Sequence, residues 1–279
     1  MNFTILLLVL LAALLHASWN ALVKIGGDGL VRLGIINMTA SLCCVPLLFI
    51  AEFPAAASWP YLAASVLIHQ AYYAFLVQGY RFGDLSLVYP IARGIAPLLV
   101  AIGGYALAGE TLNATGIGAV LLICAAIFSL AFEPGRAADS KAVFFALCTG
   151  ATIAAYTVCD GIGGRLAGDV MGYIAWLFFL EGPPIFFLAL WLRRRALLQS
   201  LNSNGMAGVA GGAFAVTAYG LVIWAMSTTP MTYVSAVRET SVLIAALIGT
   251  RLLKEPAALR RTLAAVVVII GVIVLQMGR

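Results

Sequence analysis

Long apolar stretches alternate with short polar turns along the whole chain. A helix needs about 20 residues to cross the ~30 Å hydrocarbon core of a bilayer. Ten stretches approach that length: 3–24, 33–51, 59–80, 85–108, 111–132, 142–159, 170–192, 205–227, 231–250 and 262–277. Strands in lipid would need a closed barrel and strict alternation, which the pattern lacks. We therefore predict an all-α membrane protein with ten transmembrane helices.

The polar stretch from Glu133 to Lys141 is the longest hydrophilic run near the middle of the chain. It separates two halves of five spans each. We predict a first five-helix repeat over residues 1–133, a linker over 134–141 and a second repeat over 142–279. No basic residue precedes Lys24 and no small-residue cleavage site follows the first span, so this span is expected to be retained rather than removed as a signal peptide.

Composition supports the membrane class and excludes several others. Hydrophobic residues make up 63% of the 279 positions, charged residues only 10%, and mean hydropathy is +1.06, whereas soluble domains carry ~25% charged residues. The spans leave no room for a soluble catalytic domain. Aromatic residues are not interleaved with Lys or Arg, so no nucleic-acid partner is expected. The five cysteines lack metal-binding spacing, and we expect neither metal nor cofactor.

Basic residues predict an orientation. The loops after odd-numbered spans and their flanks hold twelve, and the opposite side holds only Arg165 and Arg279. The twelve are Lys24, Arg32, Arg81, Arg136, Lys141, Arg193, Arg194, Arg195, Arg251, Lys254, Arg260 and Arg261. Because cytoplasmic loops are enriched in Lys and Arg, we place the odd-numbered loops in the cytoplasm and both termini outside. The expected location is the plasma membrane, which in bacteria is the inner membrane.

The two halves also resemble each other in sequence. A shift of 145 residues places Arg93 on Arg238 and Glu110 on Glu255, and both residue types are rare here. Five spans per half is an odd number, so the two copies would cross the membrane in opposite directions. We therefore predict two inverted five-helix repeats, an architecture in which substrates bind between the halves near the midplane.

The turn Gly109-Glu110-Thr111-Leu112, followed by Gly116 and Gly118, resembles the motif of the EamA-like branch of the drug/metabolite transporter superfamily. In the second half Lys254-Glu255-Pro256 departs from it, with Lys254 in place of glycine. The resemblance implies a central cavity lined by spans 1, 3 and 4 and by spans 6, 8 and 9, and transport by alternating access. It also implies cytoplasmic termini, opposite to the orientation that the charges favour; we follow the charges.

Four charged residues lie inside apolar spans, where charges usually face a cavity or a partner. Arg93 and its repeat mate Arg238 suit a carboxylate or phosphate, which a guanidinium binds with a planar fork. The alternative is a structural ion pair, for example between Arg238 and Glu181. His16, Glu181 and Glu239 are candidates for proton coupling or for ion pairing.

Polar and aromatic side chains recur at helical spacing on several spans. On the third span they are His69, Tyr72, Tyr73 and Tyr80, and on the sixth Thr152, Tyr156 and Asp160. We expect each such row of side chains to face the interior of the bundle, where it either packs against other helices or lines a substrate pathway. The predicted pathway residues are His16, Trp19, Asn20, His69, Tyr72, Tyr73, Tyr89, Arg93, Tyr156, Tyr219, Trp224 and Arg238.

These features favour a secondary transporter of a small metabolite, working as an exporter of amino-acid-like or carboxylate-bearing compounds. A proton gradient or the substrate's own gradient would drive it, because no phosphate-binding G-x-x-x-x-G-K-[ST] loop exists. The alternatives are a lipid-phosphate or nucleotide-sugar flippase and a non-transporting membrane scaffold subunit. No G-x-S-x-G or H-E-x-x-H motif points to an enzyme. The expected partners are the substrate and the bilayer, and the Gly208 to Gly212 spacing leaves a homodimer open.

Overall fold

The computed structural model describes residues 1–24, 28–131, 139–244 and 259–278, without the side chains of 19–24, 85–86, 203–205, 207 and 259–261. Within these residues the chain is helical and contains no strand. The elements are α1 (Phe3–Lys24), α2 (Gly29–Cys44), α3 (Leu47–Ile50), η1 (Ala56–Ser58), α4 (Trp59–Phe82), α5 (Leu85–Ala108), α6 (Ala114–Ser129), α7 (Ser140–Leu166), α8 (Val170–Thr228), α9 (Met231–Arg238) and α11 (Leu259–Met277). The helix resumes after α9 over 240–244.

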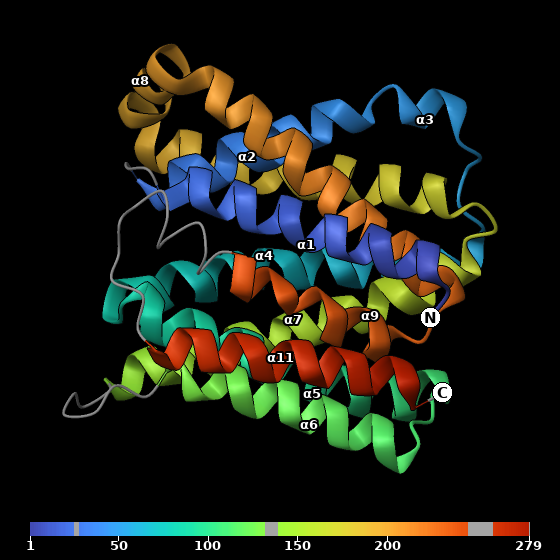
Figure 1. Ribbon diagram of the computed structural model, residues 1–279. Helices are drawn as coiled ribbons and strands as arrows, with labels where there is room; N and C mark the ends of the chain where they lie inside the picture. Colours follow the sequence, from blue (N-terminus) through green and yellow to red (C-terminus); the bar gives the residue numbers. More distant parts are fainter. Residues whose placement is uncertain (25–27, 132–138, 245–258, 279) are drawn as a thin grey trace.

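The long helices lie side by side in one bundle (Figure 1). Both chain termini lie at the same end, which we call the terminal end and which includes Asn113, Arg165 and Thr229. At this end Asn113 donates a hydrogen bond to the Gly278 carbonyl and so ties α6 to α11. The opposite end, here the basic end, carries Asp28, Arg81, Lys141 and Arg193.

Several helices begin where a short polar side chain caps free backbone N–H groups. Asp28, Asn113, Asp139 and Asp169 each accept hydrogen bonds from the first turns of α2, α6, α7 and α8, which satisfies donors that have no partner inside the helix. Gly109 ends α5 in the left-handed region, with φ of 66°, a conformation that glycine adopts without steric cost. The caps explain why predicted spans and observed helices nearly coincide.

The seventh and eighth predicted spans are assigned as one helix, α8, of 59 residues. Contacts with α2 show that its two parts run in opposite directions. In the first part, Ala189 meets Gly34 while Gly182 meets Asn37; in the second, Gly208 meets Ile35 and Gly212 meets Thr39. The reversal lies between the two candidate spans, Val170–Asn202 and Gly208–Thr228. The expected end at residue 192 was wrong: the helix continues through Arg193, Arg194 and Arg195, which are favourable helix formers.

Five described helices have the length and hydropathy of membrane spans; besides the two parts of α8, these are Gly29–Ile50, Leu87–Ala108 and Ser140–Leu166. Shorter apolar helices cover Phe3–Ser18, Ala114–Ser129 and Thr262–Met277. Large apolar side chains such as Phe3 and Trp191 are exposed, 71% and 80% respectively, as expected for a surface that faces lipid. Most of the second copy of the repeat motif, at 245–258, lies outside the described residues.

Helix α4 is long enough to span a membrane, with 24 residues, but it is not among these five. His69, glutamines and four tyrosines interrupt its apolar sequence. This helix packs against α7 and α8, and its inner face supplies much of the polar interior. Its polar residues on that face account for its lower hydropathy.

Candidate functional site

Two adjoining cavities lie inside the bundle. The outer cavity, of about 370 Å³, reaches the basic end at Asp28 and Arg193. The inner cavity, of about 70 Å³, lies deeper, between His69, Glu181 and other residues of α1, α2, α4, α7, α8 and α9. Both are lined by His16, Tyr72 and Tyr156, so together they form one path from the basic end into the interior.

An ion pair lies at each end of the bundle. At the basic end, Arg193 Nε lies 2.9 Å from Asp28 Oδ2, and the two side chains are 57% and 31% exposed. At the terminal end, Arg165 Nη2 lies 2.6 Å from Glu110 Oε1, with Glu110 only 8% exposed. The same Glu110 oxygen accepts a hydrogen bond from the backbone N–H of Met231. The ion pair at the terminal end is thus the more buried of the two.

Arg93 lines the outer cavity and is neutralised by a carboxylate. Its Nε lies 3.0 Å from Glu239 Oε2, and its Nη2 donates to the Ser241 hydroxyl at 3.2 Å. Both partners of the ion pair are buried, at 3% and 0% exposure. The ion pair suggested between Arg238 and Glu181 is not formed among the described residues; the acid that follows Arg238 in sequence, Glu239, pairs with Arg93.

Arg238 lines the inner cavity, where its guanidinium lies over the ring of Tyr219 at 5.6 Å. This geometry is that of a cation–π interaction. Its Nε is buried and has no hydrogen-bond partner among the described residues. Since a buried donor without an acceptor is costly, this N–H group marks a place where an anionic ligand would be favoured.

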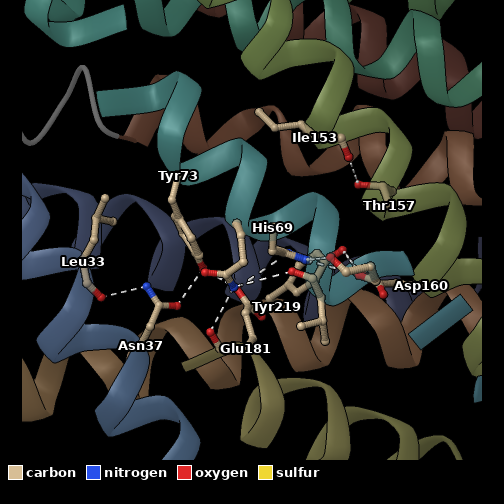
Figure 2. Close-up of polar contacts among 12 residues, drawn as sticks. Leu33, Asn37, His69, Tyr73, Ile153, Thr157, Asp160, Glu181 and Tyr219 are labelled. Atoms are coloured by element: carbon tan, nitrogen blue, oxygen red, sulfur yellow. Dashed lines mark hydrogen bonds and ion pairs between the residues drawn. The ribbon is translucent and has the colours of Figure 1, made fainter. Parts of the chain in front are cut away.

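Glu181 projects into the inner cavity from α8 and joins a hydrogen-bonded chain (Figure 2). Its Oε1 accepts a hydrogen bond from the Tyr73 hydroxyl, which also contacts Asn37 Oδ1 at 2.7 Å. His69 Nε2 lies 3.9 Å from the same Glu181 oxygen. The second oxygen, Oε2, is buried without a hydrogen-bond partner in the described part of the chain.

A second carboxylate, Asp160 of α7, lies behind the cavity wall and is completely buried. The hydroxyls of Tyr173 and Tyr219 donate to its two oxygens at 3.0 and 2.6 Å, and the Ser65 hydroxyl also interacts with this carboxylate. Asp160 does not line either cavity. It is connected to the inner cavity through Tyr219, which donates a hydrogen bond to Asp160 and also lines the cavity.

Aromatic rings form the remaining wall of the inner cavity. The Tyr156 ring stacks on His69 with centroids 3.9 Å apart, and it meets Tyr72 and Tyr219 edge-on at 5.8 and 5.5 Å. Such rigid rings present large surfaces with a polar tip. The wall can hold an apolar or aromatic part of a ligand while the charged groups bind its ends.

The cavities contain most residues of the predicted pathway. Those that line one or both are His16, His69, Tyr72, Tyr73, Tyr89, Arg93, Tyr156, Tyr219, Arg238 and Glu181. Trp224 packs against the hydrophobic core instead, and Glu239 reaches the path only through Arg93. Trp19 and Asn20 lie in α1, but their side chains are outside the described set.

Sequence reasoning missed Asn37, Ser65 and Tyr173. Asn37 is an amide in a span without charges, a signal that could have been used. Ser65 and Tyr173 carry no such signal, because isolated serine and tyrosine residues are common in membrane helices. No group of three or more His, Cys, Asp or Glu side chains able to hold a metal occurs among the described residues.

Comparisons with known proteins agree with this architecture. The model of the EamA-like transporter family matches residues 140–277, which include α7 to α11. A comparison with curated protein sequences finds no match. One solved structure, described only as the crystal structure of a protein, superposes with a TM-score of 0.79 at 15% identity over 99% of this chain and 98% of that one. This likeness shows that nearly the whole chain has the fold of that structure.

The family match, the apolar helices and the enclosed polar path lead to one assignment. The EamA-like family is a family of transporters rather than enzymes, and it belongs to the drug/metabolite transporter superfamily. The chain is a member of the EamA-like transporter family and is an integral membrane transporter.

Proposed function

We propose that this transporter is a secondary exporter of small amino-acid-like or carboxylate-bearing metabolites. One observation carries the proposal: Arg238 and Glu181 both line the inner cavity, and Arg238 Nε and Glu181 Oε2 have no hydrogen-bond partner among the described residues. A guanidinium N–H binds a carboxylate, and a carboxylate binds an ammonium group. The tyrosine wall between them would contact the rest of the substrate. The inner cavity alone holds about 70 Å³, and the adjoining outer cavity adds about 370 Å³, which brings the combined space into the size range of small-ligand sites.

Alternating access would move the substrate through the bundle. The path reaches the basic end, whereas the Glu110–Arg165 pair closes the terminal end. We propose that the two halves are inverted repeats and that they exchange these states by rocking against each other. Two features support this: α6 and α11, the last helices of each half, pack together, and Arg93 and Arg238 border the same path.

We further propose that the protein lies in the plasma membrane, the inner membrane in bacteria, with the basic end in the cytoplasm. The described part of that end carries Arg32, Arg81, Lys141 and the run from Arg193 to Arg195. A path that reaches the cytoplasmic end would load its substrate from inside the cell, which is the direction that export requires.

Ligand-induced stabilisation of the purified protein tests the substrate class. We expect L-amino acids to raise the melting temperature, because a ligand at 100 times its Kd adds about 2.7 kcal/mol to folded-state stability. Simple amines, dicarboxylates and a nucleotide sugar complete the panel. A response to the nucleotide sugar alone would favour the flippase alternative, and no response to any amino acid or carboxylate would contradict the proposal.

Two variants connect the response to the site. Arg238→Gln removes the charge of a buried guanidinium, and it should abolish stabilisation by amino acids. Arg195→Gln removes an exposed charge at the basic end and should leave it unchanged. Equal responses in both variants would exclude Arg238 from the binding site.

A further inference from the structure

The inner cavity adjoins a chain of groups that can exchange protons. Glu181 borders the cavity on one side, and the fully buried Asp160 lies on the other side of the wall. Between them, His69 Nε2 faces Glu181 at 3.9 Å, and His69 Nδ1 lies 3.2 Å from the Ser65 hydroxyl. That hydroxyl in turn interacts with the Asp160 carboxylate. Figure 2 shows Glu181, His69 and Asp160 in this succession.

We propose that Glu181, His69, Ser65 and Asp160 form a proton relay, with Asp160 as the buried proton-binding site of the transporter. This inference rests on the proposed function, to which it adds the coupling ion. Asp160 has no basic group within hydrogen-bond distance in the described structure, unlike Glu239, which is held by Arg93. A buried carboxylate without such a partner is relieved by taking up a proton.

The hydrogen bonds of His69 set the order of the transfers. Nδ1 lies 2.9 Å from the Ser65 carbonyl oxygen, which can only accept, so Nδ1 carries the ring proton and Nε2 is the free acceptor. Glu181 passes a proton from the cavity to Nε2, once the pair closes by about 1 Å to hydrogen-bond distance. Nδ1 then releases its proton to the Ser65 hydroxyl oxygen, Oγ, and the original Ser65 hydroxyl proton moves to Asp160. One proton has moved, and the imidazole ends as its other tautomer.

The relay also has a direction within the bundle. Ser65 lies six residues after the start of α4 at Trp59, and Asp160 lies six residues before the end of α7 at Leu166. At 1.5 Å per residue, both are about 9 Å from the terminal end of their helices. The proton therefore moves from a cavity that reaches the basic end toward the closed end. It needs only the opening of that end to be exchanged with the other side.

Several charged and titratable groups surround the relay and would tune it. His69 is faced by Tyr156 and Asp160 of α7, by Glu181 and Tyr219 of α8 and by Arg238 of α9, with Tyr73 on its own helix. Tyr219 links both functions, since its hydroxyl donates to Asp160 while its ring lies under the Arg238 guanidinium. Once protonated, the Asp160 carboxyl group could itself donate a hydrogen bond, which would change its hydrogen bond with the Tyr219 hydroxyl and so the position of Tyr219 at the cavity.

The proton at Glu181 would also compete with the substrate. Glu181 Oε2 has no hydrogen-bond partner among the described residues, and it is the group that we assign to the substrate's ammonium. A protonated carboxyl group no longer attracts a cation, so the proton and the substrate would occupy this residue in turn. Such exclusion favours antiport, in which an entering proton drives the substrate out.

Infrared difference spectroscopy of the purified full-length protein, without substrate, tests the relay. We expect the spectrum in mildly acidic minus mildly alkaline buffer to show a buried carboxyl C=O band that is lost in Asp160→Asn. The control Glu52→Gln removes an exposed carboxyl group and should keep the band. The amide of Asp160→Asn can accept from one tyrosine through its oxygen and donate to the other hydroxyl through its NH2 group, and a melting curve verifies that the variant folds. A band that persists in Asp160→Asn would overturn the proposal.

Two further variants test the route instead of the end point. His69→Gln and Ser65→Ala should retain the Asp160 band but slow its appearance after a pH jump by roughly 100-fold, the contribution expected of a positioned proton-transfer group. Rates equal to wild type in both would exclude the relay, even if Asp160 titrates. Because no substrate is added, this outcome is independent of the ligand screen, which can fail or succeed separately.

Discussion

The buried ion pair of Arg93 and Glu239 places a pair of opposite charges between the two halves of the chain. Both groups are almost completely removed from water, and each is the other's main partner. A buried pair adds little stability compared with apolar residues, but loss of one partner leaves an isolated charge. The pair therefore fixes which part of α5 lies against the segment after α9, and it adds little to the free energy of folding.

A double-mutant cycle tests this interpretation. Arg93→Gln alone should lower the free energy of unfolding by about 3–5 kcal/mol, because Glu239 is left charged and buried. The double variant Arg93→Gln with Glu239→Gln should recover most of this loss. Chemical denaturation in detergent measures all three. Additive losses in the double variant would show that the two side chains are not coupled.

At the scale of helices, glycines bring the backbones of α2 and α8 into contact. A Cβ atom at Gly182 would lie 2.4 Å from the carbonyl oxygen of Asn37, and one at Gly212 would lie 2.7 Å from that of Ile36. Neither contact leaves room for a methyl group. The α2–α8 pair therefore behaves as one unit, as in other membrane helices that pack through small residues.

Substitution of one glycine tests the close packing. Gly182→Ala should reduce stability by about 1–3 kcal/mol, because backbone atoms must move to admit the added carbon. Gly118→Ala is the matched control, since a Cβ at this position of α6 meets nothing within 4 Å. We expect that control to be neutral or slightly more stable. Thermal unfolding curves in one detergent compare the two, and equal melting temperatures would refute the tight contact.

Much of the element pattern could be predicted from sequence, because hydrophobic runs and capping residues are local signals. The predicted span at 85–108 coincides with α5, and the span at 3–24 with α1. The reversal of α8 beyond Asn202 falls between the predicted spans 170–192 and 205–227, but the continuation of the helix through 193–202 was not predicted, because the run of arginines was interpreted as the end of a span.

The candidate site was accessible only in part, because partners depend on tertiary geometry. Charges inside apolar runs marked Arg93, Arg238 and Glu181 as interior groups. Sequence alone could not show that Glu239 pairs with Arg93, since the two are 146 residues apart. Nor could it assign Ser65 a partner on another helix.

At the scale of the whole molecule, the two ends of the bundle differ in charge and closure, and the proposed orientation follows from that difference. Cysteine labelling with a membrane-impermeant reagent in intact cells tests it. Arg195→Cys lies exposed at the basic end and should be protected, whereas Met277→Cys, whose native side chain is 79% exposed, should be labelled. Replacing the exposed native Cys43 with serine removes background. The reverse pattern would invert the orientation.

The contacts of Glu110 determine how the terminal end can open. One carboxylate oxygen holds both the Arg165 side chain of α7 and the first N–H of α9, while Arg165 also donates to the carbonyls of Met226 and Thr229. These bonds converge on Glu110 and Arg165, so displacement of either side chain breaks several of them at once. Opening of the terminal end should then be a cooperative transition between a closed and an open state, without a half-open pore through which ions could leak.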